Sequence, residues 1–185
     1  VRHGETAWSL RHQHTGRTDI PLTERGRQDA QALGLRLRGL EFACILTSPL
    51  QRARQTAALA GFGEMAEADD DLMEWDYGVY EGLRTVEIQS ERPDWRLYED
   101  GCPEGENADA VGRRADRVIG RLRRLSADAL VFAHRDILRV LAARWLDFAP
   151  VEGRRFVLAT TSLSILGYDH DLTEPVVILW NGVRL

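Results

Sequence analysis

The chain opens with Val1-Arg2-His3-Gly4-Glu5-Thr6, and this stretch governs how the rest of the sequence is interpreted. The planar guanidinium of Arg2 can donate two hydrogen bonds to the oxygens of one phosphate group. The imidazole of His3 supplies a nitrogen nucleophile for phosphoryl transfer. Gly4 allows a ligand to approach the backbone closely. The hexapeptide therefore predicts a phosphate site, although such residues also occur in solvated polar turns.

The composition is that of an ordinary globular protein. Of its 185 residues, 44% are hydrophobic and 29% are charged, which suits one well-filled core. We expect a single domain over residues 1–185. Because His3 is expected to end a buried strand, we also expect that strand to begin upstream of Val1. Cys44 lies in an apolar run and Cys102 in a Gly-Cys-Pro turn, so neither indicates a disulfide framework or a metal site.

Charge and hydropathy exclude several classes of partner. The net charge of -5 argues against a nucleic-acid partner. No apolar run approaches the ~18 residues that a membrane span needs, so we expect no membrane partner and a cytoplasmic location. The sequence leaves the oligomeric state open, a homodimer included.

Apolar periodicity predicts helices and strands that alternate along the chain. After Thr23, a helix-capping residue, apolar side chains recur every three or four positions. Short apolar runs at 42–47 and 129–133 indicate buried strands. Their alternation implies an α/β fold, a three-layer α/β/α sandwich with a mainly parallel central sheet. The expected helices span residues 24–40, 48–60, 84–91, 107–125 and 136–146, with closing strands at 162–168 and 176–180 and loops at 61–71 and 100–105.

Reactive side chains follow the predicted strands. His3, Arg52 and His134 lie just beyond them, and the carboxyl ends of parallel strands share one edge of a sheet. We therefore expect these groups to surround one anion, together with Arg2 and the N-termini of the following helices. Glu74 is the preferred proton donor, because Met73 and Trp75 would desolvate its carboxyl group and raise its pKa. Glu81 is its rival on spacing alone.

Five segments are spread in order over nearly the whole chain: Arg2–Thr6, Thr15–Thr23, Ser48–Ala57, Leu72–Gly82 and Phe132–His134. Together they resemble the histidine phosphatase superfamily, which contains the cofactor-dependent phosphoglycerate mutases. The resemblance implies a phosphoglycerate mutase-like fold with His3 as phospho-acceptor and Glu74 as acid and base. It implies Arg2, Arg52 and His134 as phosphate ligands, and it places Ser9 where many relatives carry a phosphate-contacting Asn. Thr15 and Gly16 would line the substrate mouth.

Within the superfamily, segments 71–82 and 100–106 look most like the sugar-phosphate phosphatase branch, which includes sedoheptulose-bisphosphatase-type enzymes. The chain is also too short for the insertions and tail that shield phosphohistidine in the mutases. We therefore expect a phosphatase of the histidine acid phosphatase type that hydrolyses a small phosphorylated metabolite and needs no metal or cofactor. A phosphoglycerate mutase and a weakly active or non-catalytic phospho-ligand-binding protein are the alternatives.

One departure from the family pattern follows the second histidine. Relatives usually carry Gly there, and this chain carries Arg135-Asp136. A positive φ at Arg135 would cost roughly 1–2 kcal/mol. We expect Asp136 to cap the next helix; alternatively, Arg135 binds a second anionic group of the substrate, or activity is weakened.

We expect no catalytic or metal-binding role for the three other histidines. His12 and His14 lack the further ligands of a metal site, so we expect none there. His170 lies between the two closing strands and is expected in a solvated turn.

Overall fold

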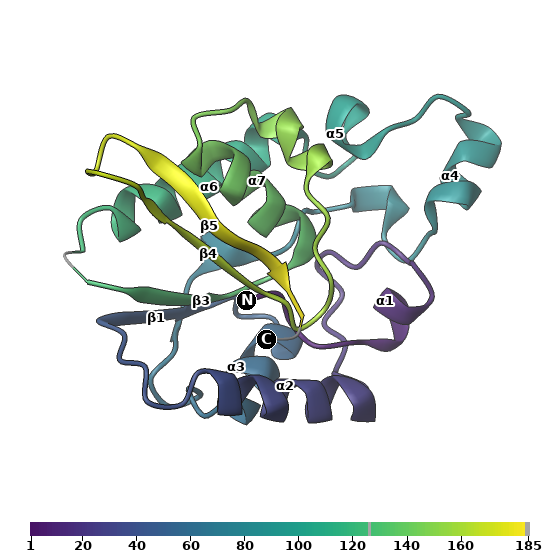
Figure 1. The fold of residues 1–185 in the computed structure, drawn as a ribbon. Coiled ribbons are helices and arrows are strands. Elements are labelled where there is room, and N and C mark those ends of the chain that lie inside the picture. Colours follow the sequence, from purple (N-terminus) through teal and green to yellow (C-terminus); the bar gives the residue numbers. More distant parts are fainter. Residues whose placement is uncertain (126, 184–185) are drawn as a thin grey trace.

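The computed structural model describes residues 1–125 and 127–183, and its centre is a parallel sheet (Figure 1). The strand order is β2 (Glu67–Ala68), β1 (Cys44–Thr47) and β3 (Ala129–Phe132). The N-terminal segment extends this sheet: Arg2 bridges Ala133 in parallel, and the His3 amide donates to the Ala133 carbonyl at 2.9 Å. The motif at the start of the chain therefore lies beside the end of β3.

Helices cover both faces of the sheet (Figure 1). On one face lie α2 (Glu24–Arg36) and α3 (Gln51–Leu59), and on the other lie α6 (Ala108–Leu122) and α7 (Arg135–Trp145). The predicted three-layer α/β/α sandwich is confirmed. The Thr23 hydroxyl accepts a hydrogen bond from the Gly26 amide at 3.0 Å, so the predicted cap of α2 is also confirmed.

The continuous apolar run of β3 serves both faces, because successive side chains of a strand point to opposite sides. Leu130 and Phe132 belong to the core cluster beneath α2 and α3, together with Leu33. Val131 and Ala133 pack into the other cluster, with α6 and α7. A strand buried on both faces has no polar alternation, which is why the sequence shows an unbroken apolar run.

The chain closes with an antiparallel pair, β4 (Leu163–Tyr168) and β5 (Pro175–Gly182). Both closing strands were predicted. Several short elements were not. Among them, β2 lies in the segment expected to be a loop, and α5 (Leu97–Asp100) has no apolar periodicity to reveal it. The helix expected from residue 48 begins at Gln51 instead. The remaining short helices are α1 (Ala7–Leu10), α4 (Thr85–Glu91) and three 3₁₀ turns at Asp70–Leu72, Gly78–Tyr80 and Pro150–Arg155.

No helix in the described part of the chain is long and apolar enough to cross a membrane.

A buried ion pair fastens the segment that carries Glu74. Two guanidinium nitrogens of Arg114, on α6, donate to the Glu106 carboxylate at 2.8 and 2.7 Å. The third donates to the backbone carbonyls of Asp71 and Met73 at 2.8 and 2.7 Å. Arg114 thus joins α6 to the irregular segment leading to Glu74, where few backbone hydrogen bonds are available.

Replacement of Arg114 by Met is expected to lower the free energy of unfolding by about 1–3 kcal/mol at pH 7, because the partly buried Glu106 carboxylate then keeps only the Asp76 amide and the more distant Arg17 as partners. Burial raises the pKa of Glu106, but Arg114 outweighs it and holds that pKa below the ordinary 4.5. A lowered carboxyl pKa stabilises the fold above its unfolded value and loses that effect as the pH falls. The destabilisation should therefore diminish below pH 4.5.

Urea unfolding at several pH values measures this difference. Arg113→Met is the matched control, since Arg113 is exposed on the same helix. An equal loss in both variants, or a loss independent of pH, would contradict the assignment.

Candidate active site

A cavity of about 430 Å³ lies at the carboxyl end of the sheet. Six of the nine predicted site residues line it, and they come from four separate stretches of the chain. The other three, Gly16, Arg52 and His134, are buried and lie outside its lining. The six are Arg2, His3, Ser9, Thr15, Glu74 and Arg135.

The hydrogen bonding of His3 defines its tautomer. Its Nδ1 lies 2.7 Å from the Gly4 carbonyl, which can only accept, so Nδ1 carries the proton and Nε2 keeps its lone pair. Burial, followed by the charges of Arg52 and Arg2, holds the pKa of His3 well below 6.5. The ring is therefore neutral and nucleophilic near neutral pH.

His134 lies beside His3, with 5.1 Å between the ring centroids. Nε of Arg52 donates to Nδ1 of His134 at 3.1 Å, so the His134 proton lies on Nε2, which is 2.7 Å from the Ser48 hydroxyl. Burial and the Arg52 charge hold the pKa of His134 well below 6.5. Both imidazoles at this site are thus uncharged.

Arg52 is fully buried and organises the loop that forms the cavity mouth. Its terminal nitrogens donate to the carbonyls of Thr15, Gly16 and Thr18 at 3.1, 2.8 and 3.0 Å. Neither Arg52 nor Arg2 forms an ion pair with a carboxylate within residues 1–125 and 127–183. Burial lowers the pKa of Arg2 to about 10 and also lowers that of Arg52. A buried cation and a half-buried one, neither with an ion-pair partner among the described residues, favour an anionic ligand.

Gly16 is required by packing. A Cβ at this position would lie 2.4 Å from the Trp75 carbonyl and 2.7 Å from Oε2 of Glu81. The Glu81 carboxylate accepts hydrogen bonds from the amides of Gly16 and Thr18 at 2.8 and 3.2 Å. Glu81 therefore holds the loop in place and does not line the cavity, whereas Glu74 does.

The Glu74 carboxylate lies at the N-terminus of α7. It is 3% exposed and accepts hydrogen bonds from the amides of Trp75, Asp136 and Ile137 at 2.9, 3.1 and 3.0 Å. Burial raises the pKa of Glu74, and the charge of Asp136 raises it further against the effect of these amides. The group is thus suited to carry a proton at higher pH than an ordinary carboxyl group.

The prediction that Asp136 caps α7 is wrong. The cap residue is His134, and Asp136 is the second residue of the helix. Its buried carboxylate instead accepts hydrogen bonds from the hydroxyls of Tyr77 and Tyr98 at 2.5 and 2.9 Å. Arg135 begins the helix with ordinary helical backbone, so the expected cost of a positive φ does not arise. Tyr77 and Tyr98 therefore bind the Asp136 carboxylate that the local sequence had predicted to cap the helix.

Ser9 has a local structural role as well as a place on the cavity wall. It forms a capping box with Thr6, in which its hydroxyl accepts from the Thr6 amide at 2.9 Å. Sequence analysis missed Gln13 and Thr85, which also line the cavity. The only signal for Gln13 was its position in a polar turn between two histidines.

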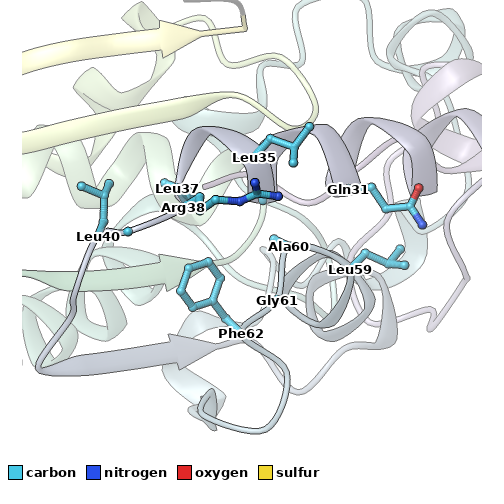
Figure 2. Close-up of a pocket in the computed structure, with 11 residues that line it drawn as sticks. Gln31, Leu35, Leu37, Arg38, Leu40, Leu59, Ala60, Gly61 and Phe62 are labelled. Carbon is cyan, nitrogen blue, oxygen red and sulfur yellow. The ribbon is translucent and has the colours of Figure 1, made fainter.

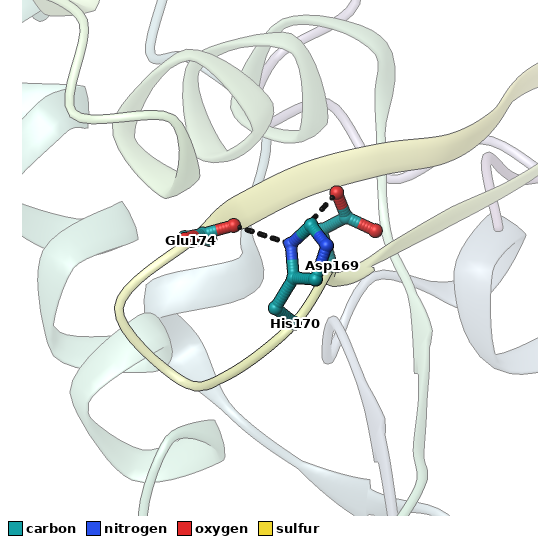
Figure 3. Close-up of side chains that lie close together, drawn as sticks. All are labelled: Asp169, His170 and Glu174. Carbon is teal, nitrogen blue, oxygen red and sulfur yellow. Dashed lines mark hydrogen bonds and ion pairs between the residues drawn. The ribbon is translucent and has the colours of Figure 1, made fainter.

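His12 and His14 also line this cavity, and the described residues bring no third metal ligand to them. The one described group that meets the geometry for a metal ion is Asp169, His170 and Glu174 (Figure 3). His170 Nδ1 lies 2.8 Å from Glu174 and 3.2 Å from Asp169. All three are exposed in the turn between β4 and β5, as expected for His170.

A second cavity, of about 380 Å³, lies between the C-terminal ends of α2 and α3 (Figure 2). Its lining combines apolar side chains, among them Leu35, Leu40 and Phe62, with the polar side chains of Gln31 and Arg38. It holds no histidine or carboxyl group, so the chemistry described above belongs to the first cavity.

A mainly parallel sheet with neutral imidazoles and guanidiniums at one end is typical of α/β proteins that bind phosphate. The chain matches the histidine phosphatase superfamily (branch 1) over residues 1–181, and it belongs to this family. The predicted family and its phosphoglycerate mutase-like fold are thus confirmed.

Named relatives agree with this membership. An acid phosphatase of Mycobacterium tuberculosis is 40% identical over 98% of this chain and 91% of that protein. The sedoheptulose 1,7-bisphosphatase of Saccharomyces cerevisiae is 39% identical over 97% of this chain and 77% of its own length. The solved structure of an open reading frame from M. tuberculosis superposes with a TM-score of 0.91 at 38% identity, covering 98% of this chain and 94% of the other. Together they support phosphatase activity on phosphorylated substrates.

Asp136→Asn is expected to lower the pKa of Glu74, because it removes a nearby negative charge and leaves the Arg135 and Arg139 guanidiniums in place. Carboxyl-carbon NMR titration of wild type and variant measures the shift directly. Tyr98→Phe is the control, since it removes a hydrogen bond to Asp136 but keeps the charge. An unchanged or raised Glu74 pKa in the folded Asp136→Asn variant would refute this account.

Proposed function

We propose that this chain is a phosphomonoester hydrolase of the histidine acid phosphatase type, which acts on a small phosphorylated metabolite, a sugar phosphate among them, through phosphohistidine at His3. The observation that carries the proposal is the His3–Gly4 hydrogen bond, which puts the ring proton on Nδ1 and leaves Nε2 available. The lowered pKa of His3 supports it, because only the neutral ring is a nucleophile.

In the first step, Nε2 of His3 attacks phosphorus, and a P–N bond forms as the bond to the leaving oxygen breaks. Glu74 gives its proton to that oxygen, so the product leaves as an alcohol. Arg2, Arg52 and His134 stabilise the negative charge of the transferred group, and the Ser9 hydroxyl contributes a further polar contact. The raised pKa of Glu74 supports its assignment as the acid.

In the second step, the Glu74 carboxylate takes a proton from water as the water oxygen attacks phosphorus. The P–N bond breaks, its electron pair returns to Nε2, and inorganic phosphate leaves. We propose that this chemistry needs no metal, because the guanidiniums supply the positive charge that a cation supplies elsewhere. Thr15 and Gly16, in the loop held by Arg52, shape the substrate mouth.

His3→Ala is expected to reduce hydrolysis of p-nitrophenyl phosphate in EDTA by on the order of 10⁴- to 10⁶-fold, as removal of a nucleophile does elsewhere. His170→Ala, at an exposed histidine of the hairpin turn, should hydrolyse it at the wild-type rate. Appreciable activity in His3→Ala would exclude His3 as nucleophile. If wild type formed 2-phosphoglycerate from 3-phosphoglycerate without free phosphate, the protein would be a mutase.

Glu74→Gln should separate the two steps. p-Nitrophenolate is a good leaving group that needs no proton from Glu74, so phosphorylation of His3 should stay fast in the variant. Hydrolysis of phosphohistidine should be slow, because the attacking water has lost its general base. We expect a rapid burst of about one p-nitrophenolate per protein, followed by slow turnover, with acid-labile phosphate on the chain. Glu81→Gln is the matched control and should show no burst, since Glu81 holds the loop instead. If Glu81→Gln showed the burst and Glu74→Gln did not, Glu81 would be the acid and base, and Glu74 would have the structural role.

A further inference from the structure

Arg135 presents a fixed positive charge to the cavity. Its side chain is 39% exposed and lines the wall. Nε and one terminal nitrogen donate to the buried Asp136 carboxylate at 3.2 and 3.1 Å. The other terminal nitrogen, NH1, has no hydrogen-bond partner among the residues that the structure describes. One edge of the guanidinium is therefore anchored, and the remaining donors are available to a ligand.

Asp136 does not neutralise Arg135, because it also pairs with Arg139. NH1 of Arg139 donates to Asp136 at 2.8 Å, and its other nitrogens donate to the carbonyls of Gly153 and Arg154. The three side chains carry one net positive charge. Arg139 is 15% exposed and lies outside the cavity lining, so the surplus charge meets the cavity through Arg135.

Among the described residues, Asp136 is the one carboxylate within ion-pair distance of Arg135. Burial and then the Arg135 charge lower the pKa of His14 to about 4, so this neighbour is neutral at pH 7. The other lining carboxylate besides Glu74, Glu5, accepts a hydrogen bond from the Thr23 hydroxyl at 2.7 Å. Nε of Arg2 is buried in the described structure without a partner, and Arg135 helps to lower the pKa of Arg2. Two like charges thus face one cavity.

We propose that Arg135 is a specificity-determining residue that binds a second anionic group, a carboxylate or a phosphate, on the substrate whose phosphoryl group is transferred to His3. This inference rests on the proposed function and names its substrate class: small metabolites with two anionic groups. Arg2 and Arg52 bind the phosphoryl group that is transferred, and Arg135 binds the second anionic group, which stays on the product. The cavity, at about 430 Å³, has the volume of a small-molecule site.

The test uses pairs of substrates that differ in the second group alone. Glycerol 3-phosphate carries a hydroxymethyl group where 3-phosphoglycerate carries a carboxylate. Fructose 6-phosphate lacks the second phosphate group of fructose 1,6-bisphosphate. Wild type should have a higher kcat/KM for the anionic member of at least one pair. Arg135→Gln should reduce that value about 10- to 100-fold, as expected for one charged hydrogen-bonded contact, and should change the other member about threefold or less. The pair that responds identifies the anion.

Arg139→Gln is the matched control, because it removes an arginine from Asp136 without altering the cavity wall. Because Asp136 then offsets more of the Arg135 charge, it should lower the discrimination ratio by less than Arg135→Gln does, since the Arg135 donors remain on the wall. An equal loss for both members of each pair in Arg135→Gln would overturn the proposal, since Arg135 would then act on the transferred phosphoryl group or on the fold. Absence of discrimination in wild type would overturn it too.

Binding to the His3→Ala variant separates this inference from the proposed function. This variant should not hydrolyse the ligands, so calorimetry can measure their affinities. In the 3-phosphoglycerate and glycerol 3-phosphate pair, or in the fructose pair, the member with the second anionic group should bind more tightly. The double variant His3→Ala/Arg135→Gln should lose this difference in affinity. If wild type released no phosphate from any substrate, the hydrolase assignment would fail, but this binding difference would still support recognition by Arg135. Equal affinities within both pairs would overturn the recognition itself.

Discussion

The buried guanidinium of Arg52 is the interaction on which the rest of the site depends. It joins His134, after β3, to the carbonyls of Thr15, Gly16 and Thr18, and so connects the edge of the sheet to the mouth of the cavity. Carbonyl dipoles satisfy its hydrogen bonds but do not cancel its charge. A buried cation that has no ion-pair partner is energetically unfavourable. The fold therefore favours binding of an anion beside Arg52.

Burial and then the same positive charge keep the two histidines neutral. Arg52 and Arg2 lower the pKa of His3, and Arg52 lowers that of His134, after the effect of burial. Protonation of either ring would add a further cation to a buried positive site. Attraction for the phosphoryl group and the neutrality of its nucleophile therefore have a common electrostatic origin.

Much of this site was predictable from sequence, because strand ends are visible as ends of apolar runs. His134 follows such a run, and parallel pairing of Arg2 with Ala133 brings His3 beside it. The carbonyl contacts of Arg52 were not predictable, since they depend on how a turn-like loop folds back over α3. β2 was missed for a related reason: two exposed residues pair with β1 through their backbone, which leaves no apolar pattern.

Asp136 shows how tertiary contacts override a local preference and join two properties of the site. Tyr77 and Tyr98, far away in sequence, hold its carboxylate inside the protein. From there its charge raises the pKa of Glu74 on one side and anchors the Arg135 guanidinium on the other. A Gly at position 135 would leave the carboxylate at 136 with Arg139 as its nearest cation. The Arg135-Asp136 pair therefore couples the proposed acid to the proposed specificity residue through one buried charge.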